Sequence, residues 1–385
     1  MSARAAESVA VAGRTVLSPV PGARDPKLAE RVAAALETDI IAASWPVGRV
    51  IGSEDQLTAR YGVSRAVIRE AVRLAEHRQI VRPRRGRGGG LVVVEPDSSA
   101  VIESLEIFLD YARVSQADLS EASAVLDTFS GSDNPALALF AAAVSSVTRR
   151  LATTPSRAAG AVADRIRQDI ADLGWPVGES LGYEADLLQR YGVGRAQFRE
   201  AVRILENHSV VRMQRGTAGG MVVTAPDGRG IVRAASLYLT YQGITNAHIR
   251  DLRGQLEAAT VQLTIERLTP AGTARLEDML ALETTWADGD FRQISHDLHA
   301  VIAELSGNQT LGLLQSIVMQ LTAERLHSGG QRRVTEPPDA VRRAHRAIVQ
   351  AIVARDVPLA LRRMDKHLRA IARWTIERPA RARTP

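Results

Sequence analysis

Three arginines are spaced so that one helix could bring all of them against DNA. Arg65, Arg69 and Arg73 follow one another at four-residue intervals, which on an α-helix places them along a single stripe. A guanidinium group can hold a guanine edge or a phosphate through two parallel hydrogen bonds. Most charged stripes on helices are only solvated surface, so the stripe alone leaves both interpretations open.

A second group of arginines follows in a stretch that reads as a β-hairpin. The runs at residues 80–82 and 91–94 predict two short strands, and the glycine-rich residues 85–90 predict the turn between them. A thin loop of this kind can approach a DNA backbone or the minor groove. The basic residues of this stretch are Arg82, Arg84, Arg85 and Arg87.

The whole pattern occurs twice, at a constant separation of 130 residues. Residues 61–73 return as residues 191–203, and 21 of the 40 pairs from 61/191 to 100/230 are identical. Such identity over ungapped positions indicates that a small domain was duplicated. The second copy repeats the arginine stripe as Arg195, Arg199 and Arg203.

Each copy predicts the elements that would position its arginines. In the first copy we expect an amphipathic helix over about residues 28–43, and Ser53 with Gln56 forms a capping box for a short helix. After a turn at residues 61–63, Ser64 is the expected N-cap of the arginine-bearing helix. These helices and the hairpin predict a winged helix-turn-helix, whose second helix enters the DNA major groove.

Three histidines in the C-terminal part suggest a different chemistry. His299, His345 and His367 lie on three separate predicted helices, each near an apolar stripe. A helical bundle can bring inward side chains together to hold a metal, and imidazole suits zinc or nickel. Histidines on separate helices are more often independent polar residues, so the spacing alone does not decide between the two.

The composition narrows the class of protein. The chain has 385 residues, so we expect two or three domains, and its net charge of +6 suits a polyanionic partner. It has no cysteine, which excludes disulfides and thiolate metal sites. The longest apolar run, residues 136–144, is too short to span a bilayer, and no apolar signal core precedes it at the N-terminus. We expect a cytoplasmic protein without a membrane partner.

The residues around the stripe resemble the DNA-binding domain of the GntR family of bacterial repressors. The resemblance rests on residues 64–71, on Ile80-Val81 with the glycine-rich wing, and on residues 52–57 at the entry to the motif. It implies that the DNA contacts are Arg65, Arg69, Arg85 and Gly86 in the first copy and Arg195, Arg199, Arg215 and Gly216 in the second.

The chain departs from the family pattern at one expected contact. Many members carry a DNA-contacting arginine near position 55, where this chain has Asp55 and, in the second copy, Ala185. The second wing is also less basic than the first, so we expect the second copy to hold DNA more weakly.

The C-terminal region resembles the effector-binding FCD domain of the FadR subfamily. The resemblance rests on Asp251, Arg253 and Glu257, on the string from His299 to Asn308, and on the separation of His345 from His367. It implies a helical bundle in which one aspartate and three histidines bind a divalent metal that helps to hold a small carboxylate effector.

The resemblance makes His299, His345 and His367 the metal ligands and leaves the carboxylate ligand missing. The family's aspartate lies one turn before the first histidine, where this chain has Ser295. Asp297 is two residues before His299 and would point away from the site. His296 lies one helical turn before His299 and could replace the missing carboxylate ligand. A neutral three-histidine site still binds zinc or nickel, with water or the effector completing the coordination.

Arg253 has two interpretations. It is a candidate partner for the effector carboxylate, or it forms an ordinary intrahelical pair with Glu257 four residues on.

We therefore predict a mainly α protein with two winged heads and an antiparallel helical bundle. Residues 98–152 still echo the second copy, which favours a truncated FCD-like stub; an independent helical linker is the alternative. The expected parts are a disordered tail (1–26), a winged domain (27–97), the stub (98–152), a second winged domain (153–227), an FCD-like domain (228–378) and a tail (379–385).

The function predicted from these parts is sequence-specific transcription regulation, with repression as the family default. A small effector would bias the spacing of the heads on a double-stranded DNA operator, either in a homodimer or in an intrachain pseudo-dimer. The alternative is a non-specific architectural DNA-binding protein with a degenerate sensor. An enzyme is disfavoured because no phosphate-binding loop, nucleophile motif or general base beside the histidines is evident.

Overall fold

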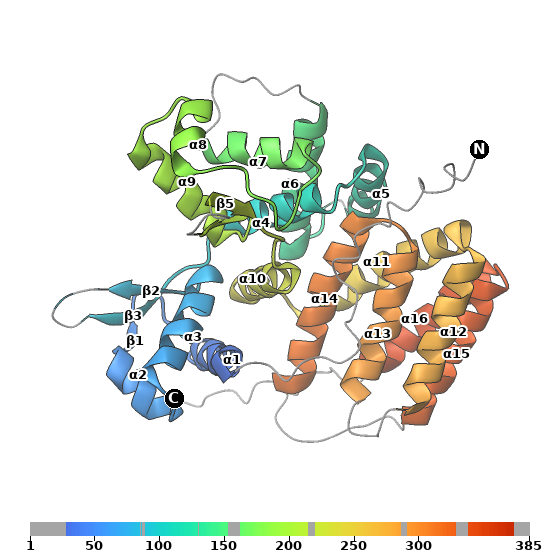
Figure 1. Cartoon of the computed structure of the whole chain (residues 1–385). Coiled ribbons are helices and arrows are strands. Elements are labelled where there is room, and N and C mark those ends of the chain that lie inside the picture. Colours follow the sequence, from blue (N-terminus) through green and yellow to red (C-terminus); the bar gives the residue numbers. More distant parts are fainter. Residues whose placement is uncertain are drawn as a thin grey trace, which may run out of the picture.

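The computed structural model describes residues 28–84, 86, 89–129, 131–152, 162–214, 220–285, 291–328 and 338–372. This part of the chain is mainly helical, and its short antiparallel strands belong to two winged heads (Figure 1). The predicted fold class is confirmed. The tails expected to be disordered, residues 1–26 and 379–385, lie outside the described residues.

The first head has the predicted helix, helix-turn-helix and hairpin. An additional strand, which the sequence did not predict, joins the hairpin, so that the sheet order is β1-β3-β2. The elements are α1 (Leu28–Ala42), β1 (Val50–Gly52), α2 (Glu54–Tyr61), α3 (Arg65–His77), β2 (Val81–Arg84) and β3 (Gly90–Val93).

Local chemistry sets the ends of the helix-turn-helix. The capping box at the start of α2 forms as predicted, because the Gln56 side chain accepts from the Ser53 amide at 2.8 Å and Ser53 Oγ accepts from the Gln56 amide at 3.3 Å. Gly62 ends α2 with a left-handed φ of 64°. Ser64 then caps α3 by accepting from the amide of Val67.

The wing requires a glycine where its second strand crosses β1. Gly90 has a φ of 148°, and a Cβ there would lie 2.6 Å from the carbonyl oxygen of Gly52. The second head repeats this contact, since a Cβ on Gly220 would lie 2.4 Å from the carbonyl oxygen of Gly182. No other residue type permits so close an approach of the two backbones.

The second head repeats the first with a reduced sheet. Its counterpart of β1 is a single bridge between Ser180 and Val222. The elements are α7 (Val162–Asp172), α8 (Glu184–Tyr191), α9 (Arg195–Asn207), β4 (Val211–Gln214) and β5 (Gly220–Val223).

Each head is followed by a connecting helix with equivalent bounds. The first is α4 (Ser98–Tyr111) and the second is α10 (Gly228–Tyr241), each bound displaced by 130 residues. Two further helices, α5 (Gln116–Asp127) and α6 (Pro135–Ala152), follow the first connecting helix. This equivalence supports the prediction that residues 98–152 are a truncated copy of the C-terminal domain, which stays a prediction.

The remaining helices form an antiparallel bundle that continues into the stub. They are α11 (Asn246–Arg267), α12 (Pro270–Thr285), α13 (Phe291–Leu305), α14 (Gln309–Ser328), α15 (Pro338–Val353) and α16 (Val357–Ala372). One apolar cluster joins the two parts, with Leu105 and Phe140 from the stub and Leu239, Leu252 and Leu314 from the C-terminal helices. The stub and the C-terminal helices are therefore packed as one body.

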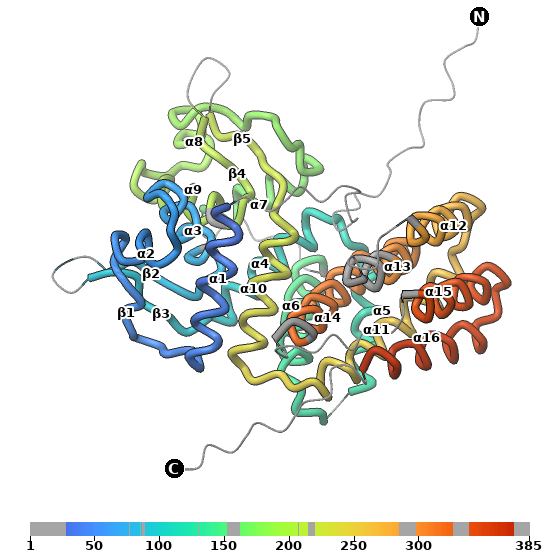
Figure 2. The backbone as a smooth tube through the Cα atoms, turned by 90° about the horizontal axis from the view of Figure 1, so that it is seen from below, coloured from blue at the N-terminus to red at the C-terminus, as the bar shows by residue number. Residues whose placement is uncertain are grey.

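The two connecting helices lie side by side between the heads and the bundle (Figures 1 and 2). None of the helices in the described part is both long enough and apolar enough to cross a membrane.

Candidate metal centre and DNA-contact surface

The three predicted histidines meet inside the C-terminal bundle. His299 comes from α13, His345 from α15 and His367 from α16, and all three side chains are buried. The Nε2 atom of His367 is 3.2 Å from the Nε2 atoms of both His299 and His345. The candidate ligand atoms of the three residues all lie within 4.8 Å of one another.

Two buried glutamates orient two of the imidazoles from behind. Nδ1 of His345 hydrogen-bonds to Oε1 of Glu283 over 2.7 Å, and Nδ1 of His299 hydrogen-bonds to Oε2 of Glu257. With the proton on Nδ1, the Nε2 lone pair of each ring points at the common centre. Metal-binding histidines in proteins are held by carboxylates in this same way.

Burial favours the neutral form of all three rings. Burial lowers the pKa of each histidine, for His345 to about 3 and for His367 well below the usual value. Burial also lowers the pKa of His299, although the charge of Glu257 opposes the shift. Neutral imidazole is the form that binds a metal ion.

The two glutamates respond differently to burial. Burial would raise the pKa of Glu257, but the charges of His299 and Arg253 outweigh it and bring this pKa to about 2. Burial raises the pKa of the Glu283 carboxyl to about 8, although the charges of His299, Arg342 and Arg346 act to lower it.

The donor set fits a divalent metal ion. Nε2 of His367 lies 3.2 Å from Nε2 of both His299 and His345, so the three buried rings converge on one point. Two nitrogens that each bind a tetrahedral zinc at about 2.0–2.1 Å lie about 3.3 Å apart. Zinc or nickel is the fitting ion for three imidazoles. The side chains of Ser295, His296 and Asp297 lie outside the described residues.

Both interpretations of Arg253 are compatible with its surroundings. Its Nε donates to Oε1 of Glu257 over 2.8 Å, which is the expected intrahelical pair. Its side chain is only 5% exposed, and its second terminal nitrogen is buried without a hydrogen-bond partner. The pair with Glu257 therefore leaves part of the guanidinium available to an anion.

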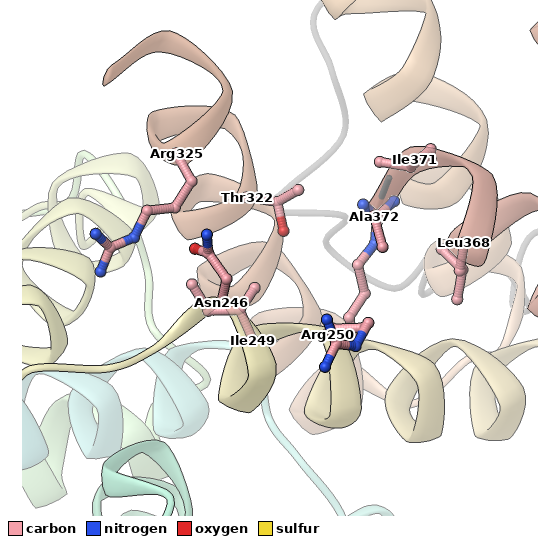
Figure 3. A pocket seen from close by; sticks show the side chains of 9 residues that line it. Asn246, Ile249, Arg250, Thr322, Arg325, Leu368, Ile371 and Ala372 are labelled. Atoms are coloured by element: carbon pink, nitrogen blue, oxygen red, sulfur yellow. The ribbon is translucent and has the colours of Figure 1, made fainter. Parts of the chain in front are cut away.

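Arg253 also lines a pocket close to the histidines. The pocket lies between the first turns of α11, the end of α14 and the end of α16 (Figure 3). Its walls combine apolar side chains with three guanidinium groups, a mixture suited to a small anionic molecule. The lining residues are Asn246, Ile249, Arg250, Arg253, Thr322, Arg325, Leu368, Ile371 and Ala372.

The arginine stripe of the first head faces solvent at the start of α3. The side chains of Arg65, Arg69 and Arg73 are 65%, 66% and 72% exposed. The opposite face of the helix holds the buried Ile68 and Ala71. The buried face therefore orients the stripe outward.

Carboxylates hold the stripe in place. Arg65 pairs with Asp55 at 2.8 Å, Arg69 pairs with Glu54 at 3.0 Å, and Arg73 pairs with Glu70 at 3.0 Å. Asp55, which stands where a DNA-contacting arginine was expected, thus forms an ion pair with Arg65, the first residue of the stripe.

The second head presents the same stripe with one acidic residue fewer. Arg195, Arg199 and Arg203 are exposed on α9. Arg199 lies 3.4 Å from Glu184, and Arg203 hydrogen-bonds to Glu200 through Nε over 3.1 Å. No carboxylate stands at position 185, where the chain has alanine.

The tips of both wings are only partly described. Gly86 is exposed with a φ of 100°, and a Cβ there would meet nothing within 4 Å. Arg85, Arg215 and Gly216 lie outside the described residues. Their roles as DNA contacts stay predictions.

Known protein families match both the winged heads and the C-terminal bundle. The description "Bacterial regulatory proteins, gntR family" matches residues 28–91 and 158–220, and "FCD domain" matches residues 248–370. The chain carries two GntR-family winged heads and one FCD domain. Regulators of this family bind DNA operators through the winged heads and small-molecule effectors through the FCD domain. These are families of transcription regulators, so the expectation of a non-enzyme is confirmed.

Similar proteins of known name are also transcription regulators. The chain is 28% identical over 204 residues to proteins named "HTH-type transcriptional repressor NanR" from Salmonella newport and Salmonella typhimurium. The match covers 51% of this chain and 77% and 76% of those relatives.

Solved structures of GntR proteins are also similar. "Streptococcus agalactiae GntR" has 23% identity and a TM-score of 0.45 over 55% of this chain and 98% of that chain. A GntR family member from Pseudomonas syringae has 20% identity and a TM-score of 0.28 over 66% of this chain and 92% of that chain.

Sequence reasoning missed the two glutamates behind the histidines. Glu257 was noticed only as a partner of Arg253, and nothing in the local pattern marked Glu283 on α12. The usable signal was a glutamate in an otherwise apolar helical position, because a buried carboxylate needs a hydrogen-bonding partner.

We expect the substitution Asp55→Ala to strengthen DNA binding. It releases Arg65 from its ion pair and removes a negative charge from the surface that we expect to meet DNA. An exposed ion pair contributes about 0.2–1 kcal/mol, so DNA affinity should rise about 1.4- to five-fold. Fluorescence anisotropy with an operator duplex at low salt measures this. Asp365→Ala, which breaks an exposed pair on α16, is the control; an unchanged affinity for Asp55→Ala would contradict the assignment of this surface.

Proposed function

We propose that the chain is a sequence-specific repressor that reads two half-sites with the two heads of a single molecule. The observation that carries the proposal is the presence of two exposed arginine stripes, at the starts of α3 and α9, on one folded body. The name of the Salmonella relatives supports repression rather than activation. The proposed contacts are Ser64, Arg65, Arg69, Arg73, Arg85 and Gly86, with Arg195, Arg199, Arg203, Arg215 and Gly216.

Selection of DNA sequences on the purified protein tests this proposal. We expect a site with two half-sites, and we expect both Arg65→Ala/Arg69→Ala and Arg195→Ala/Arg199→Ala to lose it. Each lost bidentate contact should lower the discrimination between bases by about 1–3 kcal/mol. If only the first pair matters, the second head does not read sequence. If binding weakens uniformly and no site emerges, the non-specific architectural alternative replaces the proposal.

The effector that we propose is a small carboxylate bound beside a divalent metal. A metal held by His299, His345 and His367 would supply a Lewis-acidic positive charge. The buried guanidinium of Arg253 supplies a second positive group, with a nitrogen left over for an anion. Glu257 connects the two, because it accepts from both Arg253 and His299. Anion binding and metal binding would therefore favour each other.

Titration calorimetry with zinc or nickel tests the metal part. We expect His345→Ala to abolish tight binding and Glu283→Gln to weaken it about 10–100-fold, since outer carboxylates hold ligand imidazoles in place. His248→Ala is the matched control, because this histidine lies at the start of α11 outside the cluster. Equal affinities of the native protein and His345→Ala would refute the site.

The effector signal has a short route to the first head. Thr322 and Arg325 of α14 line the pocket. Glu324, which lies between them, pairs with Arg233 of α10, and Arg233 donates to Glu37 of α1 over 2.6 Å. We propose that occupancy of the pocket shifts this end of α14 and thereby the first head, which is a coupling through one shared element.

Substitution of Glu324 tests the route. The probe is the member of a panel of two- to six-carbon mono- and dicarboxylates that most raises the unfolding temperature of the metal-loaded native protein. We expect Glu324→Gln to bind this probe with native affinity, whereas the change in DNA affinity that the probe causes should shrink at least several-fold. A native-sized response in Glu324→Gln would exclude this route.

A further inference from the structure

The two winged heads are packed on each other's connecting helices. In the first head, Trp45 packs against Tyr241 of α10, with the two rings tilted and their centroids 5.4 Å apart. In the second head, Trp175 packs against Tyr111 of α4 at the same 5.4 Å. Each head is followed directly by its own connecting helix, yet each head packs on the helix that follows the other copy (Figures 1 and 2).

The apolar cores show the same exchange. Leu237 of α10 is part of the core of the first head. Ile107, which occupies the equivalent position on α4, is part of the core of the second head together with Tyr111. These apolar contacts are nearly the same in the two copies, so they do not distinguish one connecting helix from the other.

Charges beside these contacts differ between the copies. At the first head, the fully buried carboxylate of Glu37 on α1 accepts from Nε of Arg233 on α10 over 2.6 Å. Arg78, just after α3, also pairs with Glu37. The head is therefore acidic at this position, and its connecting helix is basic.

At the second head the signs are exchanged. Position 167 on α7, the equivalent of 37, is arginine, and position 103 on α4, the equivalent of 233, is glutamate. Glu103 lies 3.5 Å from Nε2 of His208, the equivalent of Arg78, and the neighbouring Ser104 is 3.2 Å from Nδ1 of the same ring. The hydrogen bond from His208 and the charges of His208 and Arg167 hold the pKa of Glu103 below its usual value, against the effect of burial.

The exchange of signs makes only one assignment of heads to helices favourable. In the crossed arrangement Glu37 pairs with Arg233, and the charge of Arg167, whose ion pair is with Asp164, acts favourably on Glu103. If each head lay on its own connecting helix, Glu37 would meet Glu103 and Arg167 would meet Arg233. Like charges brought together at these partly buried contacts repel each other.

We infer that this reversed pair of charges is a selection device that assigns each head to the connecting helix of the other copy. Each head thus recognises the connecting helix of the other copy. That helix is similar in its apolar residues to the head's own connecting helix and differs from it in the sign of one charge. Apolar packing stabilises the contact of each head with a connecting helix, and the charges make one of the two similar helices the favoured partner.

Exchanging one pair of charges tests the device. Arg167→Glu combined with Glu103→Arg keeps the crossed pair complementary, but it also makes the uncrossed pairs complementary, Glu37 with the new arginine and the new glutamate with Arg233. The net charge of the chain is unchanged. The native chain lacks cysteine, so spin labels at Ala59→Cys on α2 and Glu277→Cys on α12 report where the first head lies.

We expect double electron–electron resonance to give one narrow distance distribution for the native chain and two for the Arg167→Glu/Glu103→Arg variant. The control Arg369→Glu/Asp365→Arg exchanges an exposed ion pair of α16 and should keep the single distribution. A single native distribution in the Arg167→Glu/Glu103→Arg variant would overturn the inference, because chain connectivity alone would then set the assignment.

The single substitution Arg167→Glu gives a second measurement. It places two acidic groups together in the crossed arrangement and should therefore lower the unfolding temperature, whereas the added Glu103→Arg change should restore it. A variant with both changes that is no more stable than Arg167→Glu alone would also contradict the inference.

Discussion

The contact between α4 and α10 is the constraint on which the arrangement of the whole molecule depends. Both helices contribute to the largest apolar cluster, through Leu105 and Phe108 on one side and Ala235 and Leu239 on the other. Each helix also presents a second face to a winged head, with Ile107 and Leu237 as its fully buried residues. Because one pair of helices serves both purposes, any change in its packing alters the positions of both heads.

A buried carboxylate organises the sensor in a comparable way. Glu257 is fully buried and accepts from both Arg253 and His299. Removing one partner of such a group would leave an uncompensated charge in the interior, which costs several kcal/mol. Glu257 therefore links Arg253, which lines the pocket, to the histidines, and the loss of either partner would destabilise the fold.

The sequence predicted the elements well because their signals are local. Helical periodicity placed the first amphipathic helix at about residues 28–43, where α1 runs from Leu28 to Ala42, and the predicted cap Ser64 does begin α3. The arginine stripe followed from spacing alone, since residues four apart share a face of any helix.

What sequence reasoning missed depends on contacts between distant segments. The strand β1 has only three residues, and it is a strand only because β3 lies beside it. Glu283 lies 62 positions before the histidine that it orients. The crossing of the heads is equally non-local, because the same apolar residues would serve either arrangement.

The duplication has left two heads that are not equivalent. The second head lacks the serine cap, since Gly194 and Tyr183 provide no side-chain cap for α9 and α8, and its third strand is reduced to one bridge. The arginine-bearing helix α9 therefore lacks a stabilising interaction that α3 has. Weaker DNA binding by this copy stays a prediction.

The inequivalence extends to control by the effector. Glu324 joins the ion pairs of Arg233 and Glu37 and so links the pocket to the first head. The first copy supplies no equivalent of α14, because position 194, which is 130 residues before Glu324, already belongs to the second head. An effector that acts through α14 therefore reaches the first head directly and the second head only through the shared pair of connecting helices. A single chain with two heads can in this way respond to an effector by moving one head relative to the other, and the spacing between half-sites is the property that such a movement changes.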